Sequence, residues 1–153
     1  MSTDLLDLFN DIVRLEIELW NAVERRLRDE HDVALSWFEV MNVVERSEAA
    51  TVNHLTRELI ITVGGASKLV DRIESAGYLR RVPHPSDGRS SILKLTPRGT
   101  RLLGGLRTTV AHELERLFNK TLPNQTVQQL ANDLRSLRSA LPVERVAKLG
   151  RCP

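Results

Sequence analysis

Apolar residues recur every three or four positions along most of this chain, which is the spacing of amphipathic helices. The spacing predicts a long helix over residues 5–28 with a wide apolar face, and a second helix over residues 37–45. Ser36 and Glu39 have the spacing of a capping box, which favours a helix start at that point. The chain is therefore expected to begin with two helices of unequal length.

Two short helical patterns follow, with a gap of about three residues between them. Thr51 and Thr62 each precede one of these patterns and are suited to cap it, and Gly77 is suited to end the second. The apolar face predicted for the second helix comprises Val63, Ala66, Leu69, Val70, Ile73 and Ala76. Its opposite face comprises Gly64, Gly65, Ser67, Lys68, Asp71 and Arg72. Two short helices joined this closely are typical of a helix-turn-helix.

The spacing then changes to one that indicates strands, over residues 78–82 and 91–95. Asp87-Gly88, in the link between them, is a strong turn sequence. The two strands are expected to form a hairpin with a long basic tip.

Two further helices complete the predicted order. Thr96-Pro97 has the cap-then-proline order of a helix start, and apolar residues recur from Leu102 to Phe118. Gly104 and Gly105 weaken this helix locally by about 1 kcal/mol each relative to alanine. A last helix starts at Pro123, and its apolar positions alternate at spacings of three and four, as in a coiled coil. Such a short seam needs a partner surface, from this chain or from a second subunit.

Length and composition support a single packed unit. The chain has 153 residues, of which 41% are hydrophobic and 27% charged, values typical of a globular protein. The fold class expected is mainly α (α+β): a winged helix-turn-helix flanked by long helices. No apolar run approaches the roughly 18 residues of a membrane span, and the first residues are acidic rather than basic, so a cytoplasmic location is expected. The single cysteine, Cys152, permits no internal disulfide and receives no role.

Charge is distributed unevenly along the chain. Residues 1–50 contain 5 basic and 12 acidic residues, whereas residues 51–99 contain 8 basic and 4 acidic ones, and residues 100–153 contain 9 and 4. This asymmetry is expected when one face meets a polyanion. The alternative is a solvated surface with accidental segregation of charge.

Gly64 and Gly65 lower the stability of the helix that contains them, at a place where the first turn of a DNA-binding helix meets base edges. Small residues there permit close approach of a partner. The alternative is that the glycines pack against a neighbouring segment.

Four short motifs resemble the MarR family of bacterial transcription regulators. They are Leu69-Val70-Asp71-Arg72-Ile73-Glu74, Gly77-Tyr78-Leu79-Arg80-Arg81, Asp87-Gly88-Arg89 and Leu95-Thr96-Pro97-Arg98-Gly99. The resemblance implies a homodimer that binds a pseudo-palindromic DNA site, with the fourth helix in the major groove. It also implies that Arg89 enters the minor groove and that Asp87 orients it. Gly88 stands where the family often has a second arginine, so one phosphate contact is in doubt.

The full set of expected DNA contacts follows from the motifs and from the charge pattern. Base and phosphate contacts are assigned to Thr62, Ser67, Lys68 and Arg72, with Gly64 and Gly65 giving access, and Arg81, Ser86, Asp87 and Arg89 belong to the wing. Thr51, Asn53 and His54 are assigned to phosphates rather than bases. The alternative for Asp87 and Arg89 is a stabilised turn with an incidental surface ion pair.

Other predictions concern ligands and self-association. Trp20, Trp37, Phe38 and Met41 are candidates for an effector pocket, and the alternative is that they belong to the core. The four histidines (His31, His54, His84 and His112) match no metal-binding spacing, so neither a metal nor a cofactor is expected. The expected dimerisation residues are Leu5, Phe9, Ile12, Leu114, Phe118, Val127, Leu130, Leu134, Leu137 and Leu141.

The function predicted is a homodimeric, sequence-specific transcriptional regulator without enzymatic activity, a repressor relieved by a small-molecule effector. Residues 34–99 would form the DNA-binding domain, and residues 1–33 and 100–153 the dimerisation helices. The partners expected are double-stranded DNA, a second copy and an effector, but no membrane. The alternative is a winged-helix protein-interaction module without specific DNA binding.

Overall fold

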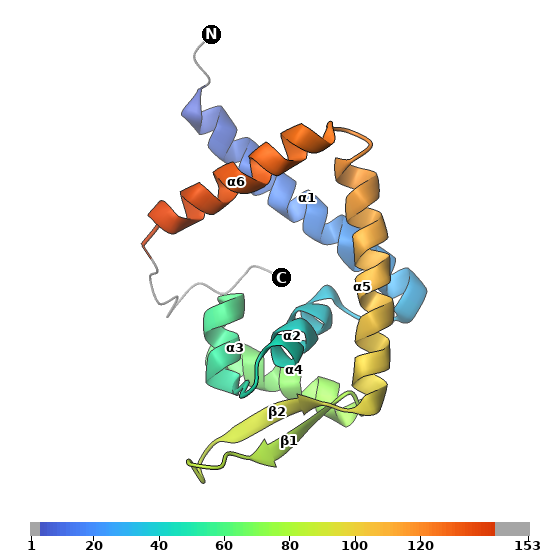
Figure 1. Ribbon diagram of the computed structural model, residues 1–153, viewed down its shortest axis with the longest axis vertical. Helices are drawn as coiled ribbons and strands as arrows, with labels where there is room; N and C mark the ends of the chain where they lie inside the picture. The colour runs from blue at the N-terminus through green and yellow to red at the C-terminus, as the bar shows by residue number, and fades with distance from the viewer. Residues whose placement is uncertain (1–3, 143–153) are drawn as a thin grey trace.

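The computed structural model describes residues 4–142 and contains six helices and one hairpin in that range. The elements in order are α1 (Leu5–His31), α2 (Leu35–Arg46), α3 (Val52–Leu59), α4 (Val63–Ser75), β1 (Leu79–Pro83), β2 (Ser91–Leu95), α5 (Pro97–Phe118) and α6 (Asn124–Ala140). Figure 1 shows α1 and α6 at one end, the hairpin at the other, and α5 running between the two ends. The predicted winged helix-turn-helix class is confirmed.

The core lies where α2 packs among α3, α4, α5 and β2. Val40, Met41, Leu55, Ile73 and Leu103 are each fully buried there. The carboxyl-terminal half of α1 closes one side of this core with two buried residues, Val23 and Leu27. One continuous core therefore supports the two short helices and the hairpin.

The hairpin is attached to the core through both of its strands. β1 and β2 are antiparallel, with Leu79 opposite Leu95 and Val82 opposite Ile92. The N–H of Leu93 donates to the carbonyl of Ala50 at 2.8 Å, which ties β2 to the segment before α3. The wing is therefore positioned relative to the helix-turn-helix by backbone hydrogen bonds.

Three of the predicted helix starts are confirmed in detail. The hydroxyls of Thr51, Thr62 and Thr96 accept hydrogen bonds from backbone N–H groups three residues later. In α2 the predicted capping box is wrong: the helix begins at Leu35, and its cap residue Ala34 makes no side-chain bond. Instead, the Glu24 carboxylate of α1 accepts from the Leu35 N–H at 2.6 Å. A tertiary contact thus satisfies the donor that a local cap would otherwise satisfy.

Gly77 ends α4 as expected, in the left-handed conformation with φ +84°. The Gly77 N–H donates to Glu74 and the Tyr78 N–H donates to Ile73, which is the Schellman pattern. Because Tyr78 takes part in this helix end, β1 begins at Leu79, one residue later than predicted, and includes Pro83.

Gly77, Tyr78, Thr96 and Gly99 form what we call the wing root, where α4, the hairpin and α5 meet. The Thr96 hydroxyl donates to the Gly77 carbonyl at 2.6 Å, and the Thr96 N–H donates to the Tyr78 carbonyl at 3.1 Å. A Cβ at position 99 would lie 2.0 Å from the Tyr78 carbonyl oxygen. The backbones approach so closely that only glycine fits at position 99.

A polar network joins α1 to α5. The Thr109 hydroxyl donates to Glu30 at 2.6 Å and lies 2.8 Å from His31 Nε2. Glu113 is only 5% exposed and accepts two hydrogen bonds from Arg116. These bonds, together with nearby arginines, keep the pKa of Glu113 below its ordinary value despite burial.

The residues predicted for dimerisation lie largely in solvent. Leu5, Phe9, Ile12, Leu114, Leu134, Leu137 and Leu141 are exposed, and Phe118, Val127 and Leu130 are half-buried. None of the residues of α6 is buried. Three of the five seam residues, Leu134, Leu137 and Leu141, remain exposed, so the described chain covers the seam only in part.

Candidate nucleic-acid interface

The first turn of α4 is open to solvent. No atom lies within 4 Å of where a Cβ on Gly64 would stand, and the Cβ position of Gly65 meets only the Thr62 hydroxyl at 3.1 Å. The described residues therefore do not support the alternative that these glycines pack against a neighbouring segment. A partner molecule can therefore approach the backbone of this turn closely without a steric clash.

Val63 does not lie where its helical phase predicted. The residue was assigned to the buried face of α4, but it is 56% exposed. It is the first residue of the helix, and the core beneath this face begins only at Ala66. Val63 is therefore a surface residue at the start of α4, although it shares its helical phase with Ala66 and Val70.

Lys68 and Arg72 lie exposed on the outer face of α4, as the sequence predicted. No ion pair involves either residue in the described part of the chain. Both charges are therefore available to a polyanion. Ser67, between them and Val63, is half-buried.

Arg81 is held by two carboxylates of α4. Its guanidinium pairs with Asp71 at 2.7 Å and also with Glu74, whose carboxylate accepts the Arg81 N–H at 3.0 Å as well. The side chain keeps 30% of its exposed area. The structure thus gives Arg81 a role that the sequence analysis missed, which is to join β1 to α4.

The wing tip is an ordered turn. The Asp87 carboxylate accepts the backbone N–H of Arg89 at 3.0 Å, and the Ser90 N–H donates to the Asp87 carbonyl at 3.1 Å. Among residues 4–142 no pair between the Asp87 carboxylate and the Arg89 guanidinium is present, which differs from the expected orientation. The stabilised turn of the alternative is present without its ion pair, and the Arg89 side chain is exposed.

The remaining predicted contacts lie at the start of α3 and in the hairpin link. Thr51 caps α3, Asn53 is exposed, and His54 Nε2 lies 3.1 Å from the Ser47 hydroxyl. Ser86 is exposed, and its N–H donates to His84 Nδ1 at 3.2 Å.

The four predicted pocket residues, Trp20, Trp37, Phe38 and Met41, have different surroundings in the structure. Met41 is fully buried, and Trp37 packs edge-to-face on Tyr78 with ring centres 6.3 Å apart. Phe38 lines a hollow of about 400 Å³ beside Arg107, and Trp20 is half-buried against the core.

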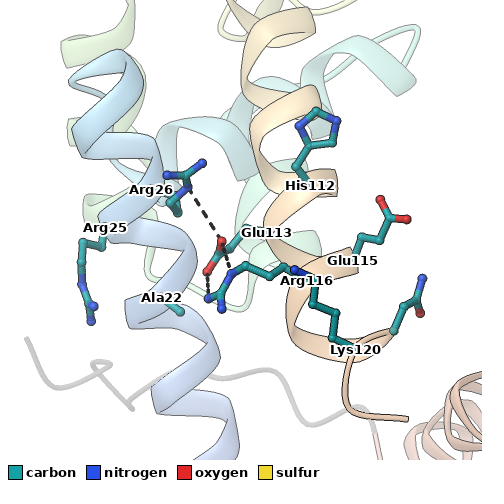
Figure 2. Close-up of a pocket in the computed structure, with 9 residues that line it drawn as sticks. Ala22, Arg25, Arg26, His112, Glu113, Glu115, Arg116 and Lys120 are labelled. Carbon is teal, nitrogen blue, oxygen red and sulfur yellow. Dashed lines mark hydrogen bonds and ion pairs between the residues drawn. The ribbon is translucent and has the colours of Figure 1, made fainter. Parts of the chain in front are cut away.

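A larger cleft of about 660 Å³ lies between α1 and α5. Figure 2 shows Arg26 of α1 pointing toward Glu113 and Arg116 of α5, whereas Arg25 and His112 point away from the space between the two helices, and Lys120 lies just beyond the end of α5. Glu113 is paired with Arg116 and lies 3.8 Å from Arg26. Basic side chains outnumber acidic ones in the lining, so the cleft is suited to an anion.

Two other kinds of feature are absent from residues 4–142. That range contains no cluster of three or more histidine, cysteine or acidic residues arranged to hold a metal. None of its helices combines the length and hydropathy needed to cross a membrane. The sole cysteine, Cys152, lies outside the described residues.

Comparisons with known proteins agree with this geometry. The profile of the MarR family matches residues 31–90. The multiple antibiotic resistance protein MarR of Escherichia coli strain K12 is 28% identical over 142 residues, covering 89% of this chain and 96% of that protein.

Solved structures show the same fold. The transcriptional regulator BldR from Sulfolobus solfataricus has a TM-score of 0.82 at 20% identity, covering 92% of this chain and 100% of that one. Sco3205, a MarR family regulator from Streptomyces coelicolor solved in complex with DNA, has a TM-score of 0.81 at 18% identity, covering 92% and 89%.

The fold and its exposed basic surface define a winged helix-turn-helix protein with long flanking helices. The profile match and the sequence relatives point to one family within this class of protein. Residues 31–90 match the MarR family, and most of the chain is similar to the multiple antibiotic resistance protein MarR of Escherichia coli.

Proposed function

We propose that this chain is a homodimeric, sequence-specific DNA-binding regulator that represses transcription by occupying a promoter. The observation that carries the proposal is the combined surface of α4 and the wing. The open first turn of α4, the unpaired Lys68 and Arg72, and the exposed Arg89 lie on two elements joined by Arg81. A helix of this kind fits the major groove, and an exposed arginine suits a narrow minor groove.

The apolar surfaces of α1 and α6 support the dimer. Leu5 is 74% exposed, Phe9 64% and Leu137 56%, and monomeric proteins seldom leave such clustered apolar residues in water. A second copy supplies an identical surface by two-fold symmetry. Two recognition helices related in this way would bind half-sites about one helical turn, or ~10 base pairs, apart.

An effector would act by favouring a dimer conformation that cannot span both half-sites. The cleft between α1 and α5 supports an effector of anionic character, because Arg25 and Lys120 line it and have no ion pair among residues 4–142. The pocket predicted at Trp20, Trp37, Phe38 and Met41 is a second candidate. Such a regulator would act in the cytoplasm, and its mechanism needs no catalytic group.

The proposal is tested by fluorescence anisotropy of the purified protein with its own upstream DNA and with a scrambled duplex, at two salt concentrations. A dimeric regulator binds the native duplex tens-fold more tightly, with two chains per site. Its affinity also falls steeply with salt, because binding releases phosphate counterions.

The alternative function is a protein-interaction module. In that case neither duplex would be preferred at either salt concentration, and the α4 surface would instead retain a protein partner in co-purification. Preferential, salt-sensitive binding of one duplex excludes this alternative.

A further inference from the structure

The first three residues of α4, Val63–Gly65, have no polar side chain with which to select a base. Thr62 precedes the helix, and its hydroxyl oxygen is engaged by the Gly65 N–H at 3.0 Å. Val63, Gly64 and Gly65 have no side-chain donor or acceptor. Polar side chains on this face begin only at Ser67, one turn further along. The part of the helix that meets base edges first is therefore apolar.

Val63 provides the side-chain surface of this turn. A single exposed valine needs no explanation on a protein surface, but the position of this one is informative. Its side chain is exposed beside a glycine whose Cβ position is empty to 4 Å, so a partner can reach the valine methyl groups without displacing another side chain. Ser67 follows four residues later on the same face of the helix.

The chemistry of the major groove limits what an apolar side chain can recognise there. Base pairs display hydrogen-bond donors and acceptors in this groove, and thymine adds its 5-methyl group, the only apolar group among them. From this, and on the basis of the proposed function, we infer that Val63 contacts the 5-methyl group of a thymine in each half-site. Val63 is thus a specificity-determining residue that selects thymine, while Lys68 and Arg72 supply phosphate contacts.

The test removes one methyl group at a time from the DNA. A duplex is first selected from a random-sequence pool by the wild-type protein, and each thymine is then replaced by deoxyuridine. At one thymine in each half-site, wild-type affinity should fall about fourfold per methyl group lost, and about tenfold or more when both half-sites are changed. Replacing the same thymine by 5-methylcytosine retains the methyl group and should restore part of the affinity that unmethylated cytosine loses.

The matched protein variant is Val63→Ala. Because Val63 is exposed and alanine favours helices, the variant should unfold at the wild-type temperature. It should bind the thymine and deoxyuridine duplexes equally, so the two changes would show a coupling in a double-mutant cycle. Val63→Thr, which keeps one methyl group in nearly the same volume, should retain part of the methyl sensitivity.

Three results would overturn the inference, and they are distinguishable. Equal loss of affinity in wild type and Val63→Ala would assign the methyl contact to another residue. Specific binding with no methyl-sensitive thymine would exclude the contact while leaving the proposed function intact. Failure of the pool to enrich any sequence would overturn both proposals.

Discussion

Arg81 on β1 and Glu74 on α4 are joined through both backbone and side chain. The Arg81 N–H and its guanidinium bind the two oxygens of the Glu74 carboxylate, and Asp71 binds a second guanidinium nitrogen. Partial burial disfavours the charged form, but the two carboxylates outweigh it and raise the pKa of Arg81. The wing is thus connected to α4 by an arginine whose guanidinium stays charged at every pH at which the protein is folded.

The first prediction concerns this connection. Arg81→Ala and Glu74→Gln should each lower the free energy of unfolding, and the double variant should lose less than the sum of the two. We expect a coupling of about 1 kcal/mol, since the pair is partly exposed. Urea denaturation at fixed protein concentration measures it, and strictly additive losses would contradict a direct role of the pair.

The second prediction concerns Arg89. Arg89→Ala should weaken operator binding about tenfold or more at matched salt, because a minor-groove arginine would be lost. The dimer and the unfolding temperature should not change, since the guanidinium has no partner among residues 4–142. Arg135→Ala is the control, because this arginine donates only to a carbonyl of its own helix in α6. Equal affinities of Arg89→Ala and wild type would remove Arg89 from the mechanism.

The third prediction concerns the leucine seam of α6. Leu137→Asp places a charge on the exposed apolar face and should shift the protein from dimer to monomer, as measured by sedimentation. DNA affinity should fall with it, because a monomer contacts one half-site. Ser136→Asp adds the same charge to the opposite face of α6 and should leave the dimer intact. A Leu137→Asp protein that sediments as the wild type would show that the seam lies outside the interface.

The fourth prediction compares two glycines of α5. Gly99→Ala should lower the free energy of unfolding by about 3 kcal/mol or more, because its Cβ would overlap a backbone carbonyl that cannot easily move. Gly104→Ala, where no atom lies within 4 Å of the added Cβ, should instead raise it by about 0.5–1 kcal/mol. Thermal unfolding of both variants measures these changes in stability. Changes of the same sign would contradict the packing assigned to the wing root.

The fifth prediction concerns Glu113 and pH. The pKa of this carboxyl is lowered in the fold, chiefly by the Arg116 hydrogen bonds, so its ionised form stabilises the protein above the ordinary value of 4.5. Glu113→Gln should therefore lower the free energy of unfolding by about 1–2 kcal/mol at pH 7. The difference from wild type should shrink as the pH falls from 4.5 towards the lowered pKa. Chemical denaturation across that range provides the test, and a pH-independent difference would rule out titration of Glu113 as the cause.

Local sequence chemistry predicted much of the fold, because many of its determinants lie within a few residues of each other. The caps at Thr51, Thr62 and Thr96 each act over three residues and were predictable. The start of α2 was not, since its cap comes from Glu24, eleven residues earlier on another helix. A local pattern contains no information about such a tertiary contact.

Some features of the candidate interface were likewise predictable from local sequence, and others were not. The outward positions of Lys68 and Arg72 follow from helical phase. The exposure of Val63 does not, because phase alone ignores where the core beneath a helix begins. The partners of Arg81 were equally hidden: the sequence contains Asp71, Glu74 and Arg81, but only the fold determines which charges meet.

The wing root has a mechanical consequence for regulation. Because α4, the hairpin and α5 are hydrogen-bonded to one another within a few residues of Thr96, a tilt of α5 would move α4 and the wing together. The far end of α5 lies beside α1 and the cleft of Figure 2. In the proposed dimer, a small change of angle there would become a large displacement of the surface that meets DNA, so the spacing of the two DNA-binding surfaces would be set at the opposite end of the molecule.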